Sequence, residues 1–455
     1  MTTPVSVVIL AAGMGTRMRS KTPKVLHRAG GLTLVEHVVR LARTVAEPEN
    51  IVVVVGHGAD DVRAVLAPYG VRTAEQTEQL GTGHAVRCAR SAAPATGHLA
   101  ILYGDAPLLT AATLAALVGD RPETATVLTA ILDDPTGYGR ILRDPEGHVA
   151  GIVEHKAATN AQREIREINS GIYCFRAEKL WAHIDDIGTN NPAGEFYLTD
   201  IVELLRAAGH LTQARILADP DELLGINTRV ELAKVDAIFR ARKVTELMLS
   251  GVTMEKPETI TVDVDVTVEA DTILESGVRL LGQTQIGGDC RIGAGSILAN
   301  ATVASNVLVH PYSVIEDSQI GAGSRVGPFA RLRMHNVVGE NAHIGNFVEL
   351  KKTHLGNGAK ANHLAYLGDA VIGDRTNVGA GTITCNYDGV HKHQTTIGEG
   401  VFVGSNSTLV APVTLEASSY IAAGSVITEQ VPGGALGIGR GRQINKPGWV
   451  AKKKG

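Results

Sequence analysis

Aliphatic residues recur at nearly every sixth position from about residue 262 to residue 430, and this period constrains the fold of half the chain. The two uninterrupted runs are Ile320, Val326, Leu332, Val338, Ile344 and Leu350, then Ile397, Val403, Leu409, Leu415, Ile421 and Ile427. An α-helix requires a period of about 3.6 and a strand a period of about 2, so neither explains this spacing. The pattern predicts a parallel β-helix, in which three short strands form each coil and the aliphatic residue of each hexad points inward.

Small residues often follow the aliphatic position, as in Ile286-Gly287, Ile320-Gly321 and Ile344-Gly345. We expect these glycines to let the backbone turn sharply between the faces of the coil. The period breaks between Val378 and Ile397, where the polar stretch 384–393 interrupts it. A polar loop that leaves a regular coil is a favoured place for function.

The first half alternates strand-like and helix-like segments. Val5–Leu10, Ile51–Val55 and His98–Tyr103 have the apolar character of buried strands, and 34–45 has helical spacing. This alternation predicts an α/β domain with a mostly parallel sheet, and such sheets bind ligands at the carboxyl ends of their strands.

The two halves are predicted to be joined by one long helix. The segment 228–250 contains no Gly or Pro and is rich in Ala, Leu, Lys, Glu and Arg, and Asn227 is placed to cap it. The sequence thus predicts an N-terminal domain over 1–229, a helical linker over 230–250 and a hexapeptide-repeat domain over 251–455.

Composition excludes several classes of protein. The net charge of −4 gives no global basic field for nucleic acid. The four cysteines stand far apart without a CxxC pair, which argues against a disulfide framework and a cysteine zinc site. No apolar segment approaches about 18 residues, so we expect neither a signal peptide nor a membrane span. The expectation is a cytoplasmic protein that binds neither nucleic acid nor membrane.

A glycine-rich loop follows the first predicted strand, in the string Leu10-Ala11-Ala12-Gly13-Met14-Gly15-Thr16-Arg17-Met18. Gly13 and Gly15 would let backbone N–H groups approach phosphate oxygens, and Arg17 and Lys24 would add cations. A Gly-x-Gly loop taken alone is equally compatible with a plain turn.

The whole string is more specific, because it resembles the loop of the nucleotidyltransferases that make nucleotide sugars. The resemblance continues through the segments 76–85, 103–105, 135–140, 152–156, 167–171, 190–200 and 225–227. Together with the C-terminal half, essentially the whole chain resembles a family of bifunctional bacterial enzymes. That family combines N-acetylglucosamine-1-phosphate uridyltransferase and glucosamine-1-phosphate acetyltransferase activities.

The resemblance implies a Rossmann-like nucleotidyltransferase domain followed by a left-handed β-helix. It implies acetyl transfer from acetyl-CoA to glucosamine-1-phosphate, followed by joining of the N-acetylglucosamine-1-phosphate to UTP with release of pyrophosphate. The product, UDP-N-acetylglucosamine, supplies cell-wall precursors for peptidoglycan and lipopolysaccharide. The resemblance also implies Mg²⁺ as cofactor, acetyl-CoA and UTP as co-substrates, and a homotrimer with active sites at the seams between neighbouring β-helices.

Matching positions assign roles in the N-terminal half by resemblance. Lys24 and Arg17 would act in catalysis, and Asp105 and Asn227 would hold Mg²⁺, an ion that prefers few protein oxygens beside water and phosphate. Substrate-binding positions are Leu10, Ala11, Ala12, Gly13 and Lys24 for the nucleotide, Gln76, Gly81 and Thr82 for uracil, and Tyr103, Gly104, Gly139, Glu154 and Asn169 for the sugar. On sequence alone, Asp105 could instead cap a helix, and Asn227 could cap a helix, bind the metal or do both.

In the C-terminal half, the resemblance makes His363 the general base that deprotonates the sugar amine, a task that suits histidine near neutral pH. On residue type alone, His343, His354, His391 and His393 are equally plausible. The glucosamine-1-phosphate pocket would comprise Arg333, Lys351, Tyr366, Asn377 and Lys392, with Arg333 and Lys351 addressing the phosphate. The acetyl-CoA positions would be Ala380, Asn386, Tyr387, Ser405, Ala423 and Arg440, with the Ala380 N–H facing the oxyanion or coenzyme.

Two other readings are open to test. In the first, the chain is a single-function nucleotidyltransferase whose β-helix serves only to oligomerise or to sense effectors; such a chain should lack the His363, Arg333 and Lys351 constellation. In the second, it is a non-enzymatic scaffold, which should have lost Gly13, Lys24 or Asp105. Every one of these residues is present.

Overall fold

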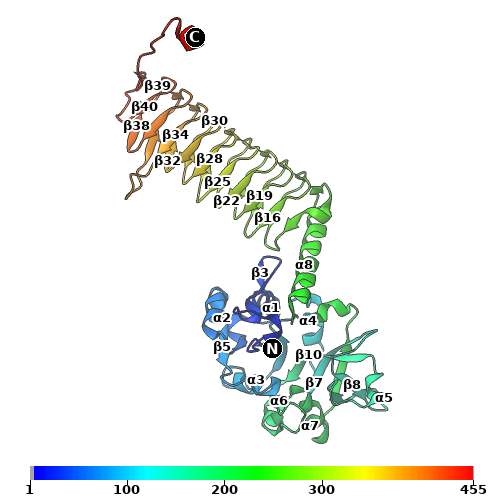
Figure 1. Cartoon of the computed structure of the whole chain (residues 1–455). Coiled ribbons are helices and arrows are strands. Elements are labelled where there is room, and N and C mark those ends of the chain that lie inside the picture. The colour runs from blue at the N-terminus through cyan, green and yellow to red at the C-terminus, as the bar shows by residue number, and fades with distance from the viewer. Residues whose placement is uncertain (1–4, 454–455) are drawn as a thin grey trace. The chain divides into compact units, whose positions relative to one another are not determined.

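The computed structural model describes residues 5–453, so the outermost residues of the first and last predicted domains, 1–4 and 454–455, lie outside it. The chain divides into two compact units between Phe239 and Arg240 (Figure 1). The predicted boundaries at 229/230 and 250/251 stay predictions. The long helix predicted over 228–250 is α8, Arg229–Leu249.

A nine-stranded sheet in the order β5-β4-β1-β6-β10-β7-β11-β9-β8 forms the centre of the N-terminal unit. It is parallel across β5, β4, β1 and β6, whereas β10 pairs antiparallel with both β6 and β7. The strands are β1 Val5–Leu10, β4 Ile51–Val55, β5 Arg72–Glu75, β6 His98–Tyr103, β7 Ala125–Ile131, β8 Arg140–Arg143, β9 Val149–Val153, β10 Glu167–Arg176 and β11 Thr212–Ile216. A two-stranded ribbon lies apart, β2 Arg28–Ala29 with β3 Leu32–Thr33.

Helices cover both faces of this sheet, which explains why β1 is apolar at almost every position. Val7 and Ile9 enter one core with α1 and α4, while Val8 and Leu10 enter the other with α3, α6 and α7. A strand buried on both faces has no solvent side and therefore no alternation. The helices are α1 Leu34–Ala42, α2 Ala59–Leu66, α3 Thr82–Ala89, α4 Ala111–Gly119, α5 Asn160–Arg163, α6 Ala177–His183 and α7 Ile201–Ala207.

The C-terminal unit is a left-handed parallel β-helix with three faces, in which each strand pairs with the strand one coil later (Figure 1). Face one holds β12 Thr253–Met254, β15 Ile273–Leu274, β18 Arg291–Ile292, β21 Leu308–Val309, β24 Arg325–Val326, β27 His343–Asn346, β30 Lys360–His363, β33 Asn377–Val378, β36 Phe402–Val403, β39 Tyr420–Ile421 and β41 Leu436–Gly437. Face two holds β13 Thr261–Val262, β16 Arg279–Leu281, β19 Ile297–Ala299, β22 Val314–Glu316, β25 Arg331–Arg333, β28 Glu349–Lys351, β31 Tyr366–Gly368, β34 Ile383–Cys385, β37 Thr408–Val410 and β40 Val426–Ile427. Face three holds β14 Thr267–Val268, β17 Gln285–Ile286, β20 Thr302–Val303, β23 Gln319–Ile320, β26 Val337–Val338, β29 His354–Leu355, β32 Ala370–Ile372, β35 Thr395–Ile397 and β38 Val413–Leu415; a short helix, α9 Trp449–Lys453, follows the coils.

The hexad residues point into this β-helix as predicted. All twelve residues of the two uninterrupted runs are buried and belong to one continuous core. The last turns of α8 contribute Val244 and Leu247 to the same core, and Arg240 pairs with Asp263 at 2.8 Å.

The predicted role of the hexad glycines is wrong. Gly321 and Gly345 do not have the positive φ that a glycine-specific turn requires. A Cβ on Gly345 would lie 1.9 Å from the Asn362 carbonyl oxygen, and one on Gly321 would lie 2.6 Å from Gly339. Glycine is needed at these positions because adjacent coils approach closely, and the left-handed corner residue comes two positions later, as at Asp289, Gly323 and Phe347.

Candidate functional sites

The loop after β1 is held at the carboxyl end of the sheet. Ala11 N–H donates to the Val54 carbonyl at 2.9 Å, and Gly104 N–H donates to the Leu10 carbonyl at 2.9 Å. Gly15 has a φ of 61°, and a Cβ on it would lie 2.6 Å from the Cβ of Lys24. Glycine therefore allows the loop to turn and lets Lys24 pack directly beneath it.

Two cations and two oxygen-bearing side chains converge beside this loop. Lys24 forms an ion pair with Asp105, and its Nζ lies 3.3 Å from Asn227 Oδ1. Arg17 also donates to Asn227 Oδ1, at 2.9 Å. Ile226 N–H donates to the Asp105 carbonyl at 3.0 Å, which fixes Asn227 next to Asp105. The four residues of the N-terminal half that were predicted for catalysis and metal binding thus lie at one point.

Asn227 was expected to cap α8, and this expectation is wrong. Thr228 Oγ1 accepts from Glu231 N–H at 3.3 Å, and the Glu231 carboxylate accepts from Thr228 N–H at 2.7 Å. These two bonds form a capping box in which Thr228 is the N-cap. The amide oxygen of Asn227 consequently faces Arg17 and Lys24.

A cavity of about 290 Å³ lies beside Lys24 and Asp105. Ten predicted residues line it: Leu10, Ala11, Ala12, Gly13, Lys24, Gln76, Gly81, Thr82, Tyr103 and Asp105. Gly81 has a φ of 110°, and a Cβ there would lie 2.6 Å from the Phe196 carbonyl, so only glycine fits. Sequence reasoning missed five further lining residues, Val25, Gln79, Ala85, Glu195 and Tyr197.

The predicted sugar residues lie together next to this cavity. Asn169 N–H donates to the Gly139 carbonyl at 2.9 Å, and a Cβ on Gly139 would lie 3.4 Å from Glu154 Oε1. Tyr103 packs against Gly171, and Tyr173 donates its hydroxyl to Asn169 Oδ1 at 3.1 Å. Gly104 is packed closely against Ala11, so it supports the loop after β1.

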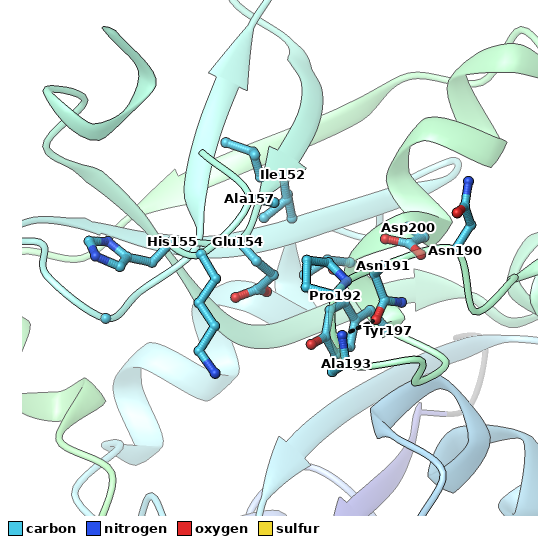
Figure 2. A pocket seen from close by; sticks show the side chains of 14 residues that line it. Ile152, Glu154, His155, Ala157, Asn190, Asn191, Pro192, Ala193, Tyr197 and Asp200 are labelled. Carbon is cyan, nitrogen blue, oxygen red and sulfur yellow. Dashed lines mark hydrogen bonds between the residues drawn. The ribbon is translucent and has the colours of Figure 1, made fainter. Parts of the chain in front are cut away.

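A second cavity, of about 450 Å³, extends from Glu154 to the segment 190–200 (Figure 2). Tyr197 lines both cavities, so the two are neighbours. Figure 2 shows the Glu154 carboxylate facing Pro192 and Tyr197 across this space. Burial raises the pKa of Glu154, and the nearby Asp200 carboxylate raises it further; burial and Glu203 likewise raise the pKa of Asp200.

On the β-helix, four predicted residues form a column at the corner between faces one and two. The register pairs Ala361 with Val378, Val378 with Val403 and Val403 with Ile421. His363, Ala380, Ser405 and Ala423 each follow these residues by two positions and therefore stack on successive coils. His363 is exposed, and its Nδ1 lies 2.9 Å from Oδ1 of Asn346, one coil earlier in the same column.

A second group lies at the corner between faces two and three. Arg333 pairs in register with Lys351, and Lys351 Nζ lies 3.3 Å from Asp369 Oδ2. Asp369 also accepts from the amide of Asn386. Arg333 Nε donates to Glu349 Oε1 at 2.6 Å, and this hydrogen bond raises the pKa of Arg333.

The remaining predicted residues are distributed around these two groups. Tyr366 reaches over Gly368, the register partner of Lys351, so it belongs with the second group. Asn377 lies on face one between Lys360 and Phe402. Arg440 is exposed beyond the last coils.

The polar loop predicted at 384–393 leaves the coil between β34 and β35. An isolated bridge pairs Tyr387 with Lys392 and closes the loop on itself. The Asp388 carboxylate accepts from His391 N–H at 2.6 Å and lies 2.7 Å from His393 Nε2. These two hydrogen bonds help to lower the pKa of Asp388 to about 2. The amide of Asn386 donates to Asp369, which places the loop beside the second group. A hydrogen bond with Lys351 and the charge of its ammonium lower the pKa of Lys392.

Sequence reasoning missed Asn346, Glu349 and Asp369. Each contacts a predicted residue on an adjacent coil, with a separation of 17 residues for both Asn346–His363 and Asp369–Asn386. The length of one coil was therefore the signal that could have identified them. The column containing His363 and the group containing Lys351 lie at different corners of the β-helix.

Comparisons with known proteins match both units. The model of the MobA-like NTP transferase domain matches residues 7–172, that of the GMPPB C-terminal domain matches 260–344, and that of the bacterial transferase hexapeptide (six repeats) matches 394–429. The chain is 53% identical to the bifunctional protein GlmU of Solibacter usitatus, over 99% of this chain and 98% of the relative. It is 49% identical to the proteins of the same name from Koribacter versatilis (99% and 97%) and Brevibacillus brevis (98% and 97%). Within residues 5–453, no helix is both long and apolar enough to cross a membrane.

Proposed function

This chain belongs to the bifunctional GlmU family, and we propose that its two activities are carried out by the two sets of residues described above. As a family member it is a uridyltransferase and an acetyltransferase that makes UDP-N-acetylglucosamine. The observation that carries this function is identity near 50% over both units together, 99% of this chain in the first relative. Uridylyl transfer belongs to the N-terminal cavity and acetyl transfer to the β-helix.

In uridylyl transfer, a phosphate oxygen of N-acetylglucosamine-1-phosphate attacks the α-phosphorus of UTP in line, and the bond to pyrophosphate breaks. No protein nucleophile is needed, because the protein positions the groups and neutralises charge. Lys24 and Arg17 face the developing negative charge, and the N–H groups of the loop after β1 contact the phosphates. Gln76, Gly81 and Thr82 hold the uracil, and Glu154 and Asn169 hold the sugar.

The residues present fit a magnesium ion. Asp105 and Asn227 supply two oxygens side by side, a set that leaves room for water and phosphate in an octahedral shell. The Lys24 ammonium forms an ion pair with Asp105 and a hydrogen bond with Asn227, which indicates that these two side chains favour a cation between them. A bound Mg²⁺ would neutralise phosphate charge and orient the pyrophosphate leaving group.

In acetyl transfer, His363 takes a proton from the 2-ammonium group of glucosamine-1-phosphate. The free amine attacks the thioester carbon of acetyl-CoA, the carbon–sulfur bond breaks, and CoA leaves as the thiol after it regains a proton. Because Asn346 Oδ1 accepts from Nδ1–H of His363, the lone pair of Nε2 is available as the base. This hydrogen bond fixes the tautomer that the reaction needs.

The other β-helix residues bind the two substrates. Arg333 and Lys351 hold the sugar phosphate with Tyr366, Asn377 and Lys392 around it. No backbone hydrogen bond in residues 5–453 uses Ala380 N–H, which is therefore available to the tetrahedral oxyanion. Asn386, Tyr387, Ser405, Ala423 and Arg440 bind acetyl-CoA.

A homotrimer is part of the proposal. His363 and Lys351 lie at different corners of one β-helix, which supports a site completed by a second copy. Tyr312, Phe329 and Phe347 form a stacked ladder with centroids 5.5 and 5.4 Å apart, and they are about half exposed. The ladder continues to Leu364, directly after His363, so a copy that covers it would reach the active site. A monomeric mass in light scattering would contradict this assembly.

We place the protein in the cytoplasm. All four cysteines are free, as suits a reducing compartment. UTP and acetyl-CoA, the proposed co-substrates, are cytoplasmic metabolites.

The proposed function is tested with the full chain by two separate assays. Pyrophosphate release is measured with N-acetylglucosamine-1-phosphate and UTP, and CoA release with glucosamine-1-phosphate and acetyl-CoA. Both are expected, and chelation by EDTA should stop only the first. Absence of CoA release would make the β-helix an inert stem, and EDTA-resistant pyrophosphate release would contradict the magnesium assignment.

A further inference from the structure

Two neighbours, Gly81 and His84, set the orientation of the Gln76 side-chain amide. Gln76 is buried, 4% exposed, and lines the cavity beside Gly81 and Thr82. Its Nε2 donates to the Gly81 carbonyl at 3.1 Å and lies 3.1 Å from Nδ1 of His84. A carbonyl oxygen only accepts, so the atom of Gln76 that faces it must be the NH₂ group.

His84 reinforces the same orientation from α3. Its Nδ1 can accept the second hydrogen of the Gln76 NH₂ group when the ring proton is on Nε2. Nε2 lies 3.8 Å from the Sγ of Cys88, one helical turn later, and a sulfur atom can accept weakly from that proton. The ring also packs near Phe196, with centroids 6.2 Å apart. Both hydrogens of the Gln76 amide are thereby occupied by the protein.

What remains of the Gln76 amide is an acceptor. No hydrogen bond among residues 5–453 ends on Gln76 Oε1. Uracil carries a hydrogen on N3, whereas cytosine has a bare N3 and an amino group at C4. A fixed amide oxygen therefore accepts from N3 of uracil and opposes the lone pair of N3 of cytosine.

We propose that His84 is a positioning residue for base selection: it holds the Gln76 amide with its oxygen toward the base and so favours UTP over CTP. The inference rests on the proposed uridyltransferase function and on Gln76 contacting the base. His84 itself does not line the cavity, so it acts only through Gln76. When the Nδ1 acceptor of His84 is removed, only the hydrogen bond to the Gly81 carbonyl holds the Gln76 amide. The amide can then rotate and present its NH₂ group to N3 of cytosine.

The test compares two substitutions of His84 in the full chain. His84→Leu fills the space without an acceptor, whereas His84→Asn places an amide oxygen near the position of Nδ1. We expect the ratio of kcat/KM for UTP over CTP to fall about five- to tenfold in His84→Leu, the effect of about one hydrogen bond. The ratio should recover in His84→Asn.

The ratio for UTP over CTP does not depend on how much of the N-terminal unit is folded, whereas acetyl transfer by the separate β-helix unit measures only how much chain is present. Equal losses for UTP and CTP in His84→Leu, with the ratio unchanged, would overturn the inference and leave His84 a structural residue. An unrescued ratio in His84→Asn would also overturn it. A wild-type chain that transfers no uridylyl group would instead overturn the proposed function, and the base-selection role with it.

Discussion

Nδ1 of His363 lies 2.9 Å from Oδ1 of Asn346 on the preceding coil, and this contact leaves Nε2 as the only ring nitrogen that can act as a base. We expect Asn346→Ala to lower kcat for acetyl transfer about tenfold or more, because the imidazole loses its fixed tautomer and orientation. KM should change little.

Asn346→Asp provides the matched variant. A carboxylate beside the ring stabilises the imidazolium, so the acid limb of the pH profile should move to higher pH. A profile identical to wild type in Asn346→Asp would show that the two side chains do not interact during turnover.

Gly345 tests the close approach of neighbouring coils. Gly345→Ala would place a Cβ 1.9 Å from the Asn362 carbonyl, next to His363, so the coils must separate. We expect a loss of about 3 kcal/mol or more in the stability of the β-helix, measured by denaturant unfolding, with loss of acetyl transfer.

The matched control is Gly119→Ala at the end of α4, where a Cβ would meet nothing within 4 Å. It should leave β-helix stability and acetyl transfer at wild-type values. Tolerance of Gly345→Ala would contradict the tight stacking of the coils.

Thr228 and Asn227 should separate stability from catalysis. Thr228→Ala removes the N-cap of α8 and should cost about 1 kcal/mol of unfolding free energy, with uridylyl transfer largely retained. Asn227→Ala should leave stability near wild type and reduce uridylyl transfer at least about a hundredfold, because a proposed Mg²⁺ ligand is lost. Thermal melting and pyrophosphate release measure the two effects; the reverse pattern would make Asn227 the cap.

Burial of the ionised Glu154 side chain in the cavity lowers the stability of the folded state at neutral pH. Burial and Asp200 raise its pKa, so the folded state binds the proton more tightly than the unfolded state. Stability from this group is therefore fully present below the unfolded pKa, about 4.3, and falls as pH rises through the folded value. Glu154→Gln should raise the melting temperature at pH 7 by about 2–4 °C, with a smaller gain near pH 4, while it lowers uridylyl transfer. An equal gain at both pH values would contradict this origin.

The parts of the fold that could be predicted are those set by burial. The apolar run of β1 and the hexads through Ile320 and Ile397 follow from which faces meet a core, and their period is visible in the sequence. Asn227 and Thr228 are both good N-caps by residue type, and the hydrogen bonds between Thr228 and Glu231 distinguish them; the capping-box spacing of Thr228 and Glu231 was the sequence signal that could have identified the cap.

Site residues could be assigned by resemblance, but their supporting partners could not. Asp369 binds Lys351 and Asn386, and His84 binds Gln76, through contacts fixed by coil stacking and by the loop before α3. Such contacts depend on register and side-chain direction, which residue type does not specify.

The central claim is that one chain carries two independent active sites. The most direct measurement follows CoA and pyrophosphate separately in a single mixture of glucosamine-1-phosphate, acetyl-CoA, UTP and Mg²⁺, with a second mixture that starts from N-acetylglucosamine-1-phosphate. His363→Ala should abolish CoA release and keep pyrophosphate release in the second mixture, whereas Asp105→Ala should keep CoA release and abolish pyrophosphate release in both. Loss of pyrophosphate release from the second mixture in His363→Ala, loss of CoA release in Asp105→Ala, or CoA release that survives His363→Ala would contradict the account.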